Sequence, residues 1–106
     1  MTKNKRDRIL KITEKIIKKI NSLGYATPAD ACEIVEMLDK LEDYLMDYKA
    51  YDTKFKKDIR YLRYLAMSIV STGPDTQKYY KKRTIGVIEI LGNKLDIWTT
   101  KEMEVE

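Results

Sequence analysis

Residues 29–52 read ADACEIVEMLDKLEDYLMDYKAYD, and their apolar residues recur at alternating steps of four and three. The recurring apolar positions are Ile34, Leu38, Leu41, Leu45 and Tyr48. This spacing places them on one side of an α-helix. Acidic residues fall on the opposite side, at Glu33, Glu36, Asp39, Asp43 and Asp47. Such a helix is not stable alone, so we expect apolar and basic neighbours to cover it.

The preceding segment has the properties of such a neighbour. Its apolar residues also follow a helical spacing, at Ile9, Ile12, Ile16, Ile20 and Leu23. Residues 1–25 carry a net charge of +6, whereas residues 26–52 carry −6. Thr27, Pro28 and Asp30 form a helix-start signal, with Thr27 as the N-cap residue. Because the link between the two segments is short, we expect an antiparallel helical hairpin.

The segment after residue 52 predicts a third helix. Its apolar residues recur with the same spacing, at Phe55, Ile59, Leu62, Ala66 and Ile69. Residues 53–72 carry a net charge of +4, and Gly73 followed by Pro74 ends the helix. Each exposed ion pair contributes only about 0.2–1 kcal/mol. The opposite charges therefore select neighbouring helices, while the apolar core holds them together.

The last segment fits two structures. As a helix it places one set of residues on a single face, namely Tyr80, Thr84, Val87, Leu91, Leu95 and Trp98. As a β-hairpin over residues 84–100 it turns at Gly92 and Asn93. The hairpin sets two like charges opposite each other, at Glu89 and Asp96. The helix contains two glycines, which disfavour it by about 1 kcal/mol each. The helix is the favoured prediction and the hairpin is the alternative.

These patterns predict an all-α fold, a small antiparallel bundle of three long helices plus a fourth. A chain of 106 residues is expected to form one domain, with loose ends at residues 1–5 and 101–106. The expected core consists of the inward apolar positions, namely Ile9, Ile12, Ile16, Ile20, Ile34, Leu38, Leu41, Leu45, Ile59, Leu62, Ala66, Ile69, Val87, Leu91 and Leu95.

The composition argues against enzymatic chemistry. The chain has no histidine, which removes the commonest general base and the commonest metal ligand. It contains no glycine-rich phosphate loop and no paired Cys/His spacing. We therefore expect no catalytic residue, no metal, no cofactor and no small-molecule substrate. The single cysteine, Cys32, is expected to be a small buried residue and favours a cytoplasmic location. No apolar run reaches the length of a membrane span.

A second stripe on the acidic helix is the first candidate for binding. Met37, Tyr44 and Tyr51 lie beside the core stripe, and Tyr64 belongs to a basic-aromatic face on the next helix. Tyrosine and methionine are typical of protein-binding surfaces. The leading hypothesis is a small interaction protein that acts as a regulator or inhibitor of a larger complex, of the kind that viruses and mobile elements encode. A wide core stripe and a homodimer are the alternatives.

Nucleic acid is the competing hypothesis for the partner. The runs FKKDIRYLRYL (residues 55–65) and YYKKR (residues 79–83) interleave cations with aromatic rings. Cations neutralise phosphates and rings stack on exposed bases. The candidate residues for this role are Lys56, Arg60, Arg63, Tyr79, Lys81, Lys82 and Arg83. The alternative is that these cations only complement the acidic helix.

Overall fold

The computed structural model describes residues 1–71 and 73–104, and this part of the chain is almost entirely helical. Its elements are α1 (Lys3–Ser22), α2 (Pro28–Leu45), a π-helical turn η1 (Tyr51–Phe55), α3 (Lys56–Val70) and α4 (Pro74–Glu104). The all-α prediction is confirmed. The hairpin alternative for residues 84–100 is wrong, because these residues lie inside α4. The helix buries Thr84, Ile88 and Leu91 on one face, which a hairpin cannot do.

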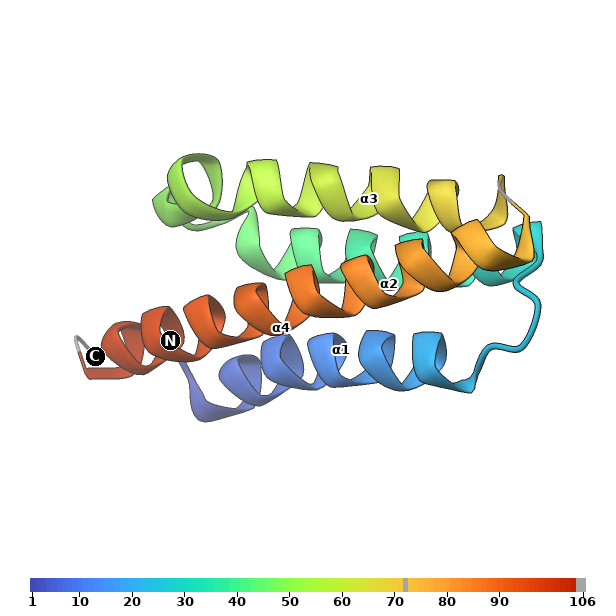
Figure 1. Ribbon diagram of the computed structural model, residues 1–106. Coiled ribbons are helices and arrows are strands. Elements are labelled where there is room, and N and C mark those ends of the chain that lie inside the picture. Colours follow the sequence, from blue (N-terminus) through green and yellow to red (C-terminus); the bar gives the residue numbers. More distant parts are fainter. Residues whose placement is uncertain (72, 105–106) are drawn as a thin grey trace.

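The four helices form an up-down-up-down bundle (Figure 1). α1 packs against α2 and α4, and α3 packs against the same two helices. The longest helix, α4, therefore closes the bundle by lying between α1 and α3. The bundle is elongated, with extents of 48 × 23 × 20 Å, and the start of α1 and the end of α4 lie at the same end of it (Figure 1).

The start of α2 follows the sequence signal. The Thr27 amide donates to the Asp30 carboxylate at 2.9 Å, and the Thr27 hydroxyl accepts a bond from the Asp30 amide at 3.4 Å. These two bonds form a capping box. The backbone hydrogen bond from Thr27, followed by the bond from Lys19, lowers the pKa of Asp30.

The quoted stretch does not remain one helix as far as residue 52. α2 ends at Leu45, the chain turns over residues 46–48, and η1 then leads into α3. This break brings Tyr48 and Phe55 against Trp98 of α4, with ring centroids 5.1 and 5.2 Å apart in edge-to-face contacts. The extra turn therefore closes one end of the core with aromatic rings.

The predicted core residues of the first three helices are all buried, as are Leu91 and Leu95 in α4. Val87 is an exception, because it is only half-buried and Ile88 occupies the core in its place. The difference of one residue follows from the position of α4, which faces α1 as well as α3. The inward direction of α4 therefore lies closer to α1 than the sequence pattern indicated.

The ends of the chain differ from the expectation. α1 begins at Lys3, and the side chain of Met1 is buried. The Met1 amino group donates to the Glu102 carbonyl oxygen at 3.2 Å, which joins the start of the chain to α4. α4 extends to Glu104, so residues 3–5 and 101–104, where loose ends were expected, belong to helices. Residues 105–106 of the predicted tail lie outside the described residues.

Two side chains of α4 hold the loop between α1 and α2. Gln77 is 2% exposed, accepts a bond from the Ala26 amide at 3.0 Å and donates to the Ala26 carbonyl at 3.2 Å. Lys81 donates to the carbonyl oxygens of Leu23 and Gly24, just after the end of α1. The last carbonyl groups of a helix lack partners within it, and Lys81 supplies a donor to carbonyl oxygens at this end of α1.

We expect Gln77→Leu to lower the free energy of unfolding by about 1–2 kcal/mol, because it leaves both buried polar groups of Ala26 without partners. Urea denaturation measures this change. Thr76→Ala is the matched control, since Thr76 is exposed and lies on the same turn. A Gln77→Leu variant as stable as the control would contradict the stabilising role assigned to the Gln77 side chain.

Candidate interaction surface

The predicted stripe of Met37, Tyr44 and Tyr51 does not form a surface. Tyr51 is 7% exposed and belongs to the core, while Met37 and Tyr44 are half-buried and packed against it. The reason is that α2 lies between α1 and α3, so its flanks are covered. These three residues therefore widen the core stripe of α2, which was the alternative to a binding surface. Tyr64 of α3 is 61% exposed and lies elsewhere.

Tyr51 instead joins a polar network that connects α2, η1 and α3. Arg63 binds Glu42 at 2.8 Å and Asp39 at 2.6 Å, and the Tyr51 hydroxyl donates to Glu42. The hydrogen bond from Arg63 is the main cause that lowers the pKa of Glu42. Burial, together with the bond to Glu42, raises the pKa of Tyr51 to about 12. The network is saturated with internal partners, which is typical of a structural role.

The candidate residues for nucleic-acid binding do not share one face. Arg63 is occupied by two carboxylates of α2, and Lys81 by the loop carbonyls. Lys56 lies 3.9 Å from Asp52 of η1. Arg60 is exposed on α3, whereas the exposed side chains of Tyr79, Lys82 and Arg83 line a groove on α4. The structure therefore brings together only the last three.

A surface that the sequence predicted only in part, through Tyr64 and Tyr79, lies on α3 and α4. Large apolar side chains with high exposure gather on these two helices, at Tyr61 (39%), Tyr64 (61%), Met67 (54%), Tyr79 (63%), Ile90 (59%) and Ile97 (61%). We call these six residues the α3–α4 face. Within the described residues, α1 and α2 carry no large apolar side chain of comparable exposure. The outward side of α2 is acidic instead, as predicted.

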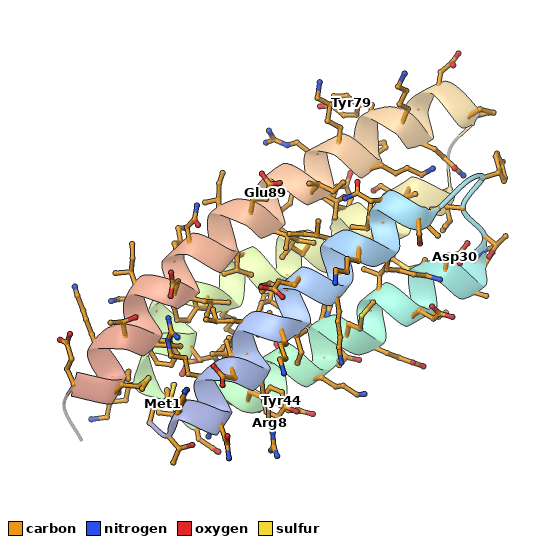
Figure 2. All side chains as sticks on the ribbon, turned by 90° about the horizontal axis from the view of Figure 1, so that it is seen from below. Met1, Arg8, Asp30, Tyr44, Tyr79 and Glu89 are labelled. Carbon is orange, nitrogen blue, oxygen red and sulfur yellow. The ribbon has the colours of Figure 1, made fainter. Side chains whose placement is uncertain are left out.

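Side-chain contacts connect the two helices across this face. The Tyr61 and Tyr64 rings are stacked, with centroids 6.3 Å apart and planes 14° apart. Arg83 of α4 donates to the Tyr61 hydroxyl at 3.3 Å. Beside Arg83 lies an open groove of about 530 Å³, lined by Tyr79, Lys82, Arg83, Gly86, Val87 and Ile90. Tyr79 lies on the outer edge of α4, near its N-terminal end (Figure 2).

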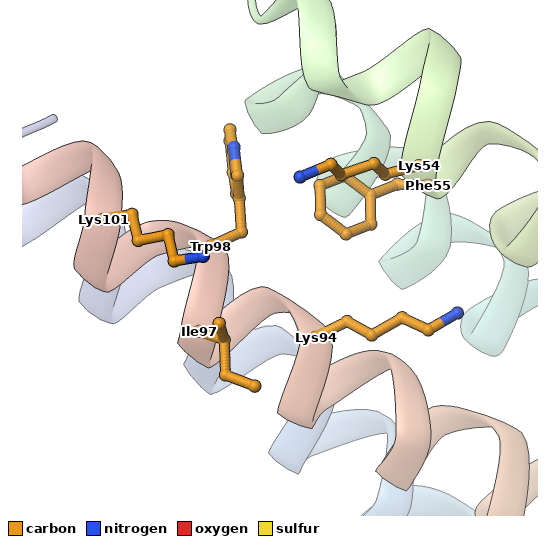
Figure 3. Close-up of a pocket in the computed structure, with 6 residues that line it drawn as sticks. All are labelled: Lys54, Phe55, Lys94, Ile97, Trp98 and Lys101. Carbon is orange, nitrogen blue, oxygen red and sulfur yellow. The ribbon is translucent and has the colours of Figure 1, made fainter.

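A second groove, of about 360 Å³, lies where η1 meets α4. Figure 3 shows its lining side chains, with the Phe55 ring beside the Trp98 indole and three lysines around them. Ile97 places an exposed aliphatic side chain at its rim. Because Ile97 lies two helical turns after Ile90, the two grooves follow one another along α4.

The charges around the α3–α4 face are predominantly basic. Lys82 and Arg83 line the first groove, and Lys54, Lys94 and Lys101 line the second. The acid nearby, Asp58, is paired with Lys94 at 3.2 Å. Glu89 and Asp96 of α4 line a different groove, which faces α1. The face therefore combines exposed apolar groups with uncompensated positive charge.

Residues 1–71 and 73–104 hold no group of three or more His, Cys, Asp or Glu side chains suited to a metal ion. Cys32, expected to be buried, is exposed on α2, so that prediction is wrong. None of the described helices combines the length and the apolar character that a membrane crossing requires. No family model, curated protein or solved structure matches the chain.

Proposed function

We propose that this chain is a non-enzymatic interaction protein that binds another protein through the α3–α4 face. The observation that supports the proposal is that six large apolar side chains stay exposed on two adjacent helices. Four of them are connected, because Tyr61 stacks on Tyr64 and accepts a bond from Arg83, which lines one groove with Tyr79 and Ile90. Large exposed apolar patches on soluble proteins mark interaction sites. Tyrosine, methionine and arginine are also the residues enriched at protein interfaces. Binding that covers a partner's surface is the means by which so small a protein regulates or inhibits a larger complex.

A protein partner explains this face better than nucleic acid does. Met67, Ile90 and Ile97 offer aliphatic surface, for which a phosphate backbone has no counterpart. Two of the cations assigned to nucleic acid, Arg63 and Lys81, are already engaged within the bundle. Tyr79 and Arg83 could stack on bases, and a gel-retardation assay tests this alternative directly. Retardation that persists at 150 mM salt and is lost with Arg83→Ala would favour nucleic acid.

We expect Tyr64→Ala combined with Ile90→Ala to reduce partner capture at least tenfold, because exposed anchors at an interface each contribute about 1–2 kcal/mol or more. The measurement compares proteins retained from a lysate of the encoding organism by immobilised parent and variant. Tyr25→Ala combined with Met46→Ala is the matched control, since these residues are as exposed but lie outside the face. Equal capture by parent and face variant would contradict the proposal.

A further inference from the structure

The outward side of α4 carries a second regular pattern besides its core stripe. Its members alternate at steps of three and four along the whole helix, at Thr76, Tyr79, Arg83, Gly86, Ile90, Asn93, Ile97 and Thr100. We call this set the outer seam. All of its residues are exposed except Gly86, which is half-exposed. At 1.5 Å per residue the seam is about 36 Å long.

This spacing is that of helix-to-helix packing. Positions that alternate at steps of three and four lie along one line of a helix, on which another helix can pack. Tyr79, Ile90 and Ile97 are the large apolar members of the outer seam, and Gly86 is its small member. The core stripe of α4 already serves that purpose toward α1 and α3. The outer seam repeats the geometry on the solvent side, with Ile90 and Ile97 seven residues apart and both about 60% exposed.

Gly86 is a position that the bundle itself does not explain. Glycine is unfavourable in a helix interior relative to alanine. A Cβ atom added at Gly86 would meet nothing within 4 Å, so no neighbour in the bundle requires its absence. Gly92 faces α1 instead, where an added Cβ would make an ordinary van der Waals contact with Thr13 Oγ1 at 3.7 Å. Gly86 lines the open groove between Tyr79 and Ile90, where a small residue lets another helix approach closely.

We propose that the partner contributes an acidic amphipathic α-helix, which packs along the outer seam with its closest approach at Gly86. This inference rests on the proposed function and specifies the partner's chemistry. The charge of the two grooves along the seam selects an acidic helix. Lys82 and Arg83 line one groove, Lys54, Lys94 and Lys101 line the other, and no described Asp or Glu lines either of them. A second copy of this chain is a poor occupant, since it would place the same cations opposite each other.

The test is a selection of displayed 25-residue random peptides on the immobilised full chain, followed by affinity measurements on the recovered peptides. We expect recovered sequences to combine a three-four apolar repeat with excess Asp and Glu, and to become helical when bound. Their affinity should fall several-fold between 50 and 300 mM salt. Binders without the repeat or without the acidic excess would overturn the inference.

Substitutions at the two glycines of α4 separate an effect on peptide binding from an effect on stability. Gly86→Ala and Gly92→Ala both remove a helix glycine of α4 where a Cβ fits, so each should raise the melting temperature by a few degrees. Gly86→Leu should weaken a recovered peptide at least tenfold, whereas Gly92→Ala should leave its affinity within twofold. Equal affinities for the Gly86→Leu variant and the parent would overturn the packing contact.

The outcomes separate this inference from the function on which it rests. Peptides that lose affinity with Tyr64→Ala and Ile90→Ala, but are neither helical nor acidic, would overturn the inference and leave the proposed function standing. Peptides insensitive to these substitutions would count against both. Light scattering of the parent should report a monomer, and a dimer abolished by Gly86→Leu would assign the outer seam to a second copy instead.

Discussion

Replacing Phe55 with alanine is expected to lower the free energy of unfolding by about 3–5 kcal/mol, the largest effect among the changes considered. Phe55 is 1% exposed, and its ring lies 5.2 Å from that of Trp98. It is also the last residue of η1, the turn that joins the first half of the bundle to α3. The substitution therefore removes a buried ring and leaves a cavity where α4 meets that turn.

Urea denaturation followed by tryptophan fluorescence measures this effect, because Trp98 is the only tryptophan in the chain and contacts Phe55 directly. Lys54→Ala is the matched control, since Lys54 is the preceding residue of η1 and is exposed. We expect the control to stay within about 0.5 kcal/mol of the parent. A loss below about 1 kcal/mol for Phe55→Ala would show that η1 does not pack as described.

Arg63→Leu is expected to lower the free energy of unfolding at pH 7 by about 2–3 kcal/mol. Removing one partner of a partly buried ion pair leaves the other charge without compensation, and full burial would make the effect larger. Arg63 binds both Glu42 and Asp39, and its side chain is 30% exposed. Arg60→Leu is the control on the same helix, because Arg60 is exposed and makes no ion pair with the described residues.

The loss of stability expected for Arg63→Leu depends on pH, because it depends on the charge of Glu42. The pKa of Glu42 is lowered below its ordinary value of 4.5, mainly by Arg63. The folded state therefore gains stability from Glu42 above about pH 4.5, and this gain is lost as the pH falls through the lowered pKa. The difference between parent and Arg63→Leu should accordingly shrink below pH 4.5. A difference that stays constant from pH 7 to pH 3 would contradict the assigned cause.

Tyr51 responds at the opposite end of the pH scale. Because its pKa is raised from 10.0 to about 12, the protonated hydroxyl stabilises the fold below pH 10, and this stabilisation is lost as the pH rises toward 12. The bond from Tyr51 to Glu42 is therefore present throughout the neutral range. The network remains fully paired at any pH between the two transitions.

The first three helices could be predicted because each has one apolar side and one polar side. Ile34, Leu38 and Leu41 repeat at helical spacing, and acidic residues occupy the opposite side. The sequence therefore indicates both that the segment is helical and which side of the helix is buried. α4 is different, because apolar residues occur on two of its sides, with Leu91 and Leu95 inward and Ile90 and Ile97 outward. That distribution made a hairpin a reasonable alternative and hid the difference between Val87 and Ile88.

The candidate surface was harder to predict than the fold. A helical pattern shows which residues share a side but not whether a neighbouring helix covers it. Met37 and Tyr44 lie beside the core stripe, and they are covered because α2 has a helix on each flank. Ile90 and Ile97 lie at a comparable spacing on α4 and stay exposed. The three-four repeat from Thr76 to Thr100 was available in the sequence as a signal, although only the bundle shows that it faces solvent.

Chemical-shift mapping tests the central claim most directly, namely that this protein acts through the α3–α4 face. The measurement records amide spectra of the ¹⁵N-labelled chain during titration with a partner or with a recovered peptide. We predict that the largest shifts fall on the residues of the face and on Gly86, while the acidic outward side of α2 stays unchanged. Shifts centred on α1 and α2, with none on α3 and α4, would contradict the claim.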